Sequence, residues 1–169
     1  MRDLIESFLI NCNPTNDPTI ILSWAQSIDG FLSLKEGQAS AISCPETLVL
    51  THIIRSLCQG ILVGINTIIT DDPILTCRLE GNPSSPIPVI LDSTLRIPLN
   101  SRILERSPII CTTKKADPIA KDLLEKRGAQ IEVIDENSTG SIDLHRYDIF
   151  YGLILGCCRY LNPNMGLII

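Results

Sequence analysis

Residues 60–78 read GILVGINTIITDDPILTCR, and the rest of the chain is organised around them. The short apolar run 60–63 has branched side chains and is bounded by glycines, so it predicts a strand buried on both faces. Gly64 ends this strand, and a glycine there permits a positive φ angle or the close approach of a ligand. We expect a loop to follow, because Pro73 disfavours the helical conformation at Asp72.

Polar side chains of this stretch suggest a ligand site. Asn66 and Thr67 follow the predicted strand at its carboxyl end, where open parallel sheets bind ligands. Asp71 and Asp72 follow, although an acidic pair before proline is also common in plain surface turns. The stretch ends in Arg78, whose planar guanidinium suits a phosphate.

The composition is that of a globular protein, and it argues against some classes of binding partner. The 169 residues are 44% hydrophobic and 20% charged, which predicts one domain with a sizeable core. A net charge of -5 and only 4% aromatic residues argue against nucleic acid, and the charge also argues against anionic membranes. No apolar run reaches membrane-spanning length, and the acidic start does not resemble a secretory signal, so we expect a cytoplasmic protein.

The cysteines do not form a metal-binding or disulfide pattern. They are odd in number, scattered and without a CxxC pair: Cys12, Cys44, Cys58, Cys77, Cys111, Cys157 and Cys158. Only His52 and His145 could complete a metal site. We therefore expect reduced thiols that pack as small apolar side chains, and no metal.

Strands and helices alternate along the chain. We expect strands at 19–24, 60–63, 87–91, 108–111 and 130–134, and helices at 1–11, 45–57 and 118–127. This order predicts an α/β fold with a mostly parallel central sheet flanked by helices. The strand 87–91 also leads into a polar loop, which begins Asp92-Ser93.

The helix 45–57 carries two basic side chains of interest. Ser43 and Glu46 have the spacing of a capping box at its start. Arg55 is either a solvated helix residue or a cation near the helix C-terminus that faces the ligand loop. His52 fits a packed surface histidine better than a catalyst.

Four motifs in order carry a family resemblance. They are AQSIDG (25–30), SCPETLVLTHIIRS (43–56), GILVGINTIITDDPILTCR (60–78) and PVILDSTLRIPLNSRIL (88–104). With them the chain resembles the 2,5-diamino-6-ribosylamino-4(3H)-pyrimidinone 5′-phosphate reductases of riboflavin biosynthesis, within the dihydrofolate-reductase-like superfamily. The AQS form of the first motif is similar to the fungal branch.

The resemblance implies a reaction and a set of binding residues. NADPH would reduce the ribosyl group of the substrate to ribityl, delivering hydride to C1′ of an opened sugar imine. By motif, the cofactor-binding residues would be Ala25, Thr67, Asp71 and Ser93. The residues that hold the phosphorylated pyrimidine would be Arg55, Leu75 and Arg78. The resemblance does not identify a catalytic residue in this sequence. It also implies that the protein forms a homodimer.

The chain also departs from the family pattern. Bacterial members carry a lysine where Ser23 stands, and members continue into a V-E-G-G motif that has no match here. We therefore expect an N-terminal helix and connector (1–18), an incomplete reductase-like domain (19–147) and a divergent tail (148–169). Last strands that are missing or atypical would expose an apolar edge, giving weak activity and self-association.

Two alternatives stay open. In the first, the chain is an inactive, truncated remnant that at most binds a ligand or dimerises. Binding of NADPH would distinguish the enzyme from this remnant. A reductase acting on a pterin is the other, and the arrangement of Asp71 and Arg78 fits it less well.

Overall fold

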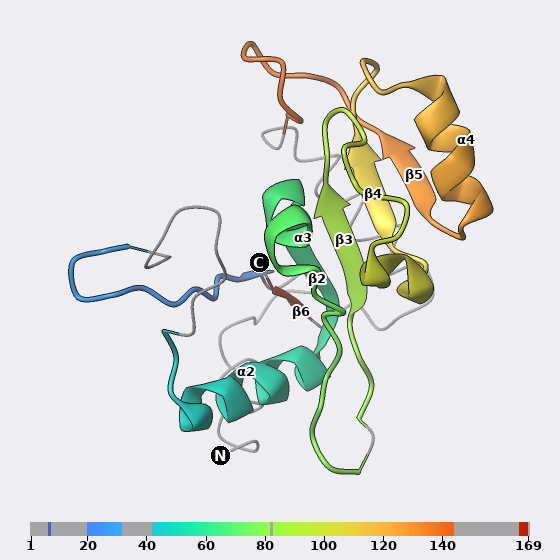
Figure 1. The fold of residues 1–169 in the computed structure, drawn as a ribbon. Helices are drawn as coiled ribbons and strands as arrows, with labels where there is room; N and C mark the ends of the chain where they lie inside the picture. The colour runs from blue at the N-terminus through green and yellow to red at the C-terminus, as the bar shows by residue number, and fades with distance from the viewer. Residues whose placement is uncertain (1–6, 8–19, 32–41, 82, 144–165, 169) are drawn as a thin grey trace.

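A parallel sheet forms the centre of the molecule. The computed structural model describes residues 7, 20–31, 42–81, 83–143 and 166–168. Its six strands lie in the order β1-β6-β2-β3-β4-β5, and all neighbouring pairs are parallel (Figure 1). They are β1 (Ile20–Ile21), β2 (Cys58–Gly64), β3 (Ile87–Leu91), β4 (Ile109–Thr112), β5 (Gln130–Val133) and β6 (Gly166–Ile168). The predicted α/β class is confirmed.

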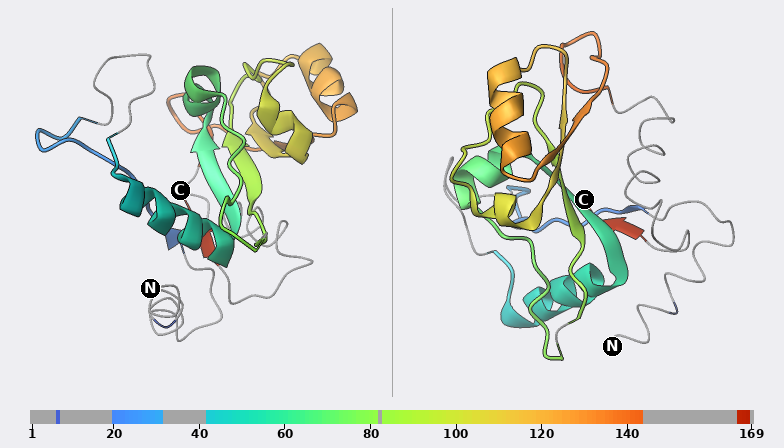
Figure 2. Two further views of the ribbon diagram at one scale, coloured as in Figure 1. Left: turned by 60° about the horizontal axis from the view of Figure 1, so that its bottom comes forward. Right: turned by 90° about the vertical axis from the view of Figure 1, so that its right-hand side faces the viewer.

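Helices connect the strands and cover the sheet. They are α2 (Pro45–Leu57), α3 (Ile65–Asp71), the 3₁₀ helix η1 (Arg102–Arg106) and α4 (Pro118–Lys126). Buried residues of α3, η1 and α4 belong to one apolar cluster, which places these three elements on the same face of the sheet. Figure 2 shows α3 and α4 on that common side.

Two apolar clusters fill the two faces of the sheet. Ile90 and Ile110 are fully buried in the cluster beneath the helices. Their neighbours Val89 and Ile109 lie in the other cluster. Successive side chains of a strand point to opposite faces, so strands buried on both sides need the continuous apolar runs seen in the sequence.

Several predicted boundaries are confirmed. The strand 87–91 is β3, and the predicted strands 108–111 and 130–134 each match an observed strand to within one residue. The helix 118–127 ends one residue early, before Gly128 with its φ of 89°. The predicted helix 1–11 falls outside the described residues except for position 7.

The strand predicted at 19–24 is much shorter in the structure. Among the described residues β1 pairs only with β6, through Ile20 with Leu167 and Ile21 with Ile168. Leu22 and Trp24 lie outside the strand, without a strand partner among the described residues, and both are exposed.

The predicted loop after Gly64 is wrong, because residues 65–71 form α3. Ile65 and Ile68 lie one turn apart and are both buried, which is the pattern of an amphipathic helix. Gly64 has a φ of −76°, so it does not use the left-handed region. Asp72 does, with a φ of 39°, and ends the helix just before Pro73.

The start of α2 also differs from the prediction. Cys44 is the N-cap and no side chain caps the helix, so the Ser43–Glu46 capping box is not formed. Pro45 occupies the first helical position, where its missing N–H costs no hydrogen bond. The helix therefore starts with a proline instead of a side-chain cap.

The segment expected to be a divergent tail enters the sheet. β6 comes from 166–168 and lies between β1 and β2, pairing with both. β6 thus covers the side of β2 that faces away from β3. The exposed apolar edge and the self-association expected from the sequence stay predictions.

Candidate functional site

His52 and Arg55 join α2 to the chain between α3 and β3. One Arg55 guanidinium nitrogen donates to the carbonyl of Thr76 at 3.4 Å. The His52 carbonyl accepts from the Cys77 thiol at 3.2 Å, and His52 Nδ1 accepts from the backbone N–H of Arg78 at 3.3 Å. Arg55 is thus partly buried against residues 76–78 and is not a solvated helix residue. Its contact with a ligand stays a prediction.

Arg106 holds the same stretch from the other side. Its Nη1 donates to the carbonyls of Ile74 (3.2 Å) and Leu75 (3.0 Å), and its Nη2 donates to that of Pro86 (2.8 Å). Leu75 has a φ of 57°, a left-handed conformation that costs a non-glycine residue about 1–2 kcal/mol. The three hydrogen bonds of Arg106 stabilise this turn. We call Arg55, Arg78 and Arg106 the cation cluster.

The charges of the cation cluster are crowded. Burial lowers the pKa of Arg55, and the nearby Arg78 and Arg106 lower it further, while Cys77 acts in the opposite direction. Burial, then Arg55 and Arg78, also lower the pKa of His52. Arg55 Nε is buried and has no hydrogen-bond partner.

No carboxylate in the described part of the chain compensates this charge. The ion pairs among the described residues involve lysines between positions 114 and 126 instead. A group of guanidiniums with an unused buried donor suits an anion with several oxygens, such as a phosphate.

The cation cluster lies at the amino ends of β2 and β3. Arg55 is in the last turn of α2, just before β2, and Pro86 immediately precedes β3. Thr67 and Ser93, two of the residues predicted to bind cofactor, follow the carboxyl ends of the same strands, whereas Ala25 follows β1. From Cys58 to Gly64, β2 spans about 20 Å at about 3.3 Å per residue. The structure therefore places the cation cluster and Thr67 at opposite ends of β2.

Polar groups at the carboxyl ends of β2 and β3, which we call the carboxyl edge, are linked to each other. Thr67 is exposed on α3. Arg96 donates to Asn66 Oδ1 at 3.1 Å, which ties the loop after β3 to α3. The Ser93 carbonyl accepts from the N–H and the hydroxyl of Thr113, at 3.2 and 2.8 Å. Thr67 and Ser93 thus lie on connected elements.

The two adjacent carboxylates have different environments. Asp71 is the last residue of α3 and is exposed. Asp72 is partly buried, and its Oδ1 accepts from the backbone N–H of Arg102 at 2.9 Å. Asp72 therefore fixes the start of η1, whereas the carboxylate of Asp71 faces solvent.

Two buried polar residues lie at the carboxyl ends of the neighbouring strands β3 and β4. Asp92 and Thr112 are both fully buried, and Asp92 Oδ2 accepts from the backbone N–H of Ile97 at 2.9 Å. Asp92 Oδ1 and Thr112 Oγ1 have no hydrogen-bond partner. The bond to Ile97 closes the loop that contains Ser93.

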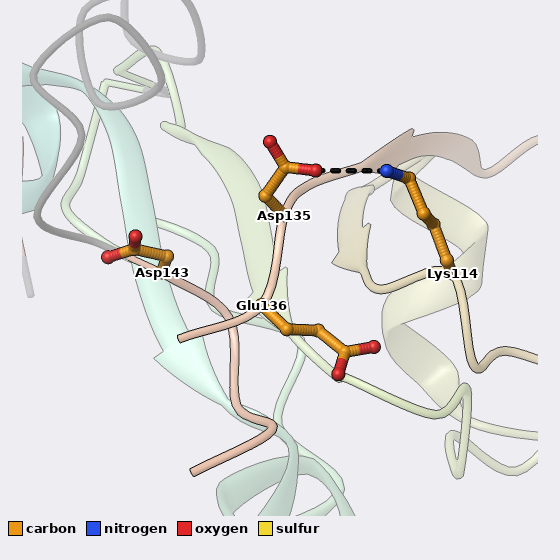
Figure 3. Close-up of a pocket in the computed structure, with 4 residues that line it drawn as sticks. All are labelled: Lys114, Asp135, Glu136 and Asp143. Atoms are coloured by element: carbon orange, nitrogen blue, oxygen red, sulfur yellow. Dashed lines mark hydrogen bonds and ion pairs between the residues drawn. The ribbon is translucent and has the colours of Figure 1, made fainter. Parts of the chain in front are cut away.

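A cavity at the carboxyl ends of β4 and β5 was not predicted from the sequence. It has a volume of about 630 Å³ and is lined by Lys114, Asp135, Glu136 and Asp143 (Figure 3). Lys114 pairs with Asp135 at 3.1 Å. The signal was present, since charged residues follow both strands, but no known motif marks them.

Two predicted site residues are placed less favourably. Ala25 lies in the exposed segment after β1, which projects away from the sheet in Figure 1. Leu75 is only 5% exposed and packs in the core, so its side chain is not at the surface of the cation cluster. Ligand contact by both residues stays a prediction.

The described residues contain neither a metal-binding cluster nor a membrane-spanning helix. The described residues contain no group of three or more His, Cys, Asp or Glu side chains that could hold a metal ion. Within the same residues, no helix has the length and apolar character to span a bilayer. No disulfide joins the cysteines at positions 44, 58, 77 and 111, and burial raises the pKa of Cys58 to about 11.

The similar sequences belong to proteins that are named for riboflavin biosynthesis or for one of its reductases. The riboflavin biosynthesis protein RibD of Aquifex aeolicus is 38% identical over 135 residues, which are 79% of this chain and 37% of that protein. The 2,5-diamino-6-ribosylamino-4(3H)-pyrimidinone 5′-phosphate reductase of Debaryomyces hansenii is 34% identical over 151 residues, 85% of this chain and 59% of that protein. The chain thus spans well under two thirds of the length of these relatives.

Solved structures and a family model agree with them. RibD of Acinetobacter baumannii matches with a TM-score of 0.66 at 21% identity, covering 91% of this chain and 39% of that one. The riboflavin biosynthesis reductase of Saccharomyces cerevisiae matches with a TM-score of 0.65 at 24% identity, covering 98% and 69%. These likenesses show the fold. Residues 18–146 match the model of the RibD C-terminal domain, and the chain therefore belongs to the RibD C-terminal domain family.

Proposed function

We propose that this chain forms part of a reductase that converts the ribosyl group of 2,5-diamino-6-ribosylamino-4(3H)-pyrimidinone 5′-phosphate to ribityl, with NADPH as the reductant. Relatives from Debaryomyces hansenii and Methanothermobacter thermautotrophicus are named for the reduction of this compound. The observation that carries the proposal is the cation cluster, in which Arg55 has an unused buried donor and no carboxylate of the described residues pairs with it.

The substrate phosphate would bind at the cation cluster. Arg78 has an exposed side chain that offers a two-pronged contact, and Arg55 lies beside it with its chain already ordered on Thr76. Ordering the guanidinium before binding reduces the entropy that binding costs. The phosphate would in turn relieve the mutual repulsion of these cations.

The carboxyl edge fits a dinucleotide. Exposed hydroxyl, amide and guanidinium groups gather there on Thr67, Asn66 and Arg96. A side chain at Gly64 would meet nothing within 4 Å, so the backbone is open at this point. NADPH would be held by Thr67, Asp71 and Ser93, with Ala25 as the fourth predicted contact.

The task of the protein side chains would be orientation. NADPH, when bound, would supply the hydride that reduces C1′ of the opened sugar imine. The cation cluster would fix one end of the substrate, and the carboxyl edge would fix the cofactor. Holding two reactants in the correct geometry is itself a large part of catalysis. We assign no catalytic acid or base, and we propose that the protein acts as a homodimer.

Titration of the purified chain with NADPH, followed by the fluorescence of Trp24 and of the nicotinamide, tests this proposal. We expect saturable NADPH binding, and a second saturation with the phosphorylated pyrimidine. The sequence also allowed an inactive remnant that acts at most as a dimerising module. Absence of NADPH binding by a folded chain would favour that remnant and contradict the proposal.

A further inference from the structure

His52 accepts hydrogen bonds from Cys77 and Arg78, one at its backbone carbonyl and one at its imidazole ring. Its carbonyl accepts from the Cys77 thiol at 3.2 Å, and its Nδ1 accepts from the Arg78 N–H at 3.3 Å. The N–H of Cys77 donates to Ser85 Oγ at 2.9 Å, so this stretch is held from two sides. The side chain of Arg78 is exposed, and its direction therefore depends on how the backbone is held.

His52 and Arg55 together fix the register between α2 and this stretch. Three residues apart on a helix, they lie on the same face. Arg55 bonds to the carbonyl of Thr76 and His52 to the N–H of Arg78, two residues further on. With both contacts in place the stretch cannot slide along α2.

The ring can accept at Nδ1 only while that nitrogen carries no proton. Neutral His52 then has its proton on Nε2, and protonation would place two N–H groups against each other. Burial lowers the pKa of His52, and the charges of Arg55 and Arg78 lower it further, which favours the neutral form. Cys77 is the other titratable neighbour, and its thiol donates to the carbonyl of His52.

We propose that neutral His52 is a positioning residue of the phosphate site, whose Nδ1 fixes the Arg78 backbone so that Arg78 and Arg55 reach the same phosphate. This inference rests on the proposed function, because it takes the substrate phosphate as the ligand of the cation cluster. His52 acts through Arg78 and does not touch the reacting atoms.

Two nearly matched variants separate positioning from packing. In His52→Asn the amide oxygen can occupy the Nδ1 position, whereas in His52→Gln the amide reaches the Nε2 position instead. We expect the affinity of His52→Asn for the phosphorylated substrate to stay close to that of the wild type. For His52→Gln we expect an affinity about three- to tenfold weaker, the effect of one lost hydrogen bond. NADPH affinity should be unchanged in both variants.

A double-mutant cycle with Arg78→Ala then tests the route of the effect. If His52 acts through Arg78, the loss caused by His52→Gln disappears in the Arg78→Ala background. An Arg78→Ala variant with unchanged substrate affinity would contradict the proposed phosphate site itself. If Arg78→Ala weakens binding, but His52→Gln either has no effect or adds fully to it, the role of His52 is overturned.

The ring state of the wild type gives a readout independent of substrate binding. Nitrogen-15 NMR of the labelled chain at neutral pH should show His52 neutral, with its proton on Nε2. A proton on Nδ1 would overturn the proposal even where a variant fails to fold.

Discussion

The cation cluster and the carboxyl edge lie at opposite ends of the same two strands, and they hold their polar groups differently. In the cation cluster, Arg55 and Arg106 are partly buried and bond to backbone carbonyls. At the carboxyl edge, Thr67 and Asp71 are exposed on a short helix. Substitutions in the first region should therefore affect folding or phosphate binding, whereas those in the second should affect the cofactor alone.

This difference also concerns charge. The cation cluster concentrates positive charge, which burial of Arg55 makes costly unless an anion is present. The carboxyl edge mixes Asp71, Thr67 and Arg96, and its groups are solvated. A region of crowded, partly buried cations gains more from an anionic ligand than a solvated region does.

The largest expected effect is that of Arg106→Ala on stability. The change leaves the carbonyls of Ile74, Leu75 and Pro86 without their donor, and we expect the free energy of unfolding to fall by about 3 kcal/mol. Urea denaturation measures it. Arg102→Ala is the control, since that side chain is exposed on the same 3₁₀ helix and should cost less than about 0.5 kcal/mol. Equal losses of unfolding free energy in the two variants would show that the three hydrogen bonds of Arg106 do not stabilise the fold.

The next effect separates the two adjacent carboxylates. Asp71→Ala should weaken NADPH binding by about tenfold or more, because a hydrogen bond to a charged group contributes about 1.5–3 kcal/mol. Asp72→Ala should leave NADPH affinity nearly unchanged but lower the unfolding free energy by about 1 kcal/mol, since the Arg102 N–H loses its acceptor. Fluorescence titration and urea denaturation measure the two quantities. Equal effects on NADPH would remove the assignment of Asp71.

Arg78→Lys should have a somewhat smaller effect, confined to the substrate. Lysine keeps the charge but loses the two-pronged contact, so we expect the affinity for the phosphorylated substrate to fall about tenfold. NADPH affinity should not change. A fall in NADPH affinity instead would place Arg78 in the cofactor site.

The smallest effect is a pH dependence of stability caused by His52. Its folded pKa is lowered from 6.5, by burial first and then by Arg55 and Arg78. Below pH 6.5 the unfolded chain therefore binds more protons than the folded one, and stability is lost as the pH falls toward the lowered folded pKa. The unfolding free energy of the wild type, minus that of His52→Asn, should decrease as the pH falls below 6.5. A flat difference would mean that the imidazole is not held neutral.

The sequence predicted best those elements that local pattern determines. β3 was found at its observed bounds because a short apolar run ends in the polar Asp92. α3 was missed because the acidic pair before Pro73 indicated a loop, although the spacing of Ile65 and Ile68 already favoured a helix. Here the strong turn signal of the acidic pair and proline outweighed the weaker helical spacing of the isoleucines.

Other features depend on residues far apart in the chain. β1 pairs with β6, which comes from the other end of the sequence. Arg106 belongs to no motif, and only the fold brings it to the carbonyls of Ile74 and Pro86. The bond between His52 and Arg78 likewise needs α2 to dock beside the later segment. Patterns within a short window cannot contain such information.

The central claim is that the cation cluster binds the substrate phosphate, and calorimetric titration tests it most directly. The wild-type chain and the Arg55→Ala/Arg78→Ala variant would each be titrated with the phosphorylated pyrimidine and with its dephosphorylated form. We predict that the wild type prefers the phosphorylated ligand by about tenfold or more, and that the variant has lost this preference while keeping its NADPH affinity. Equal wild-type affinity for the two ligands would contradict the account.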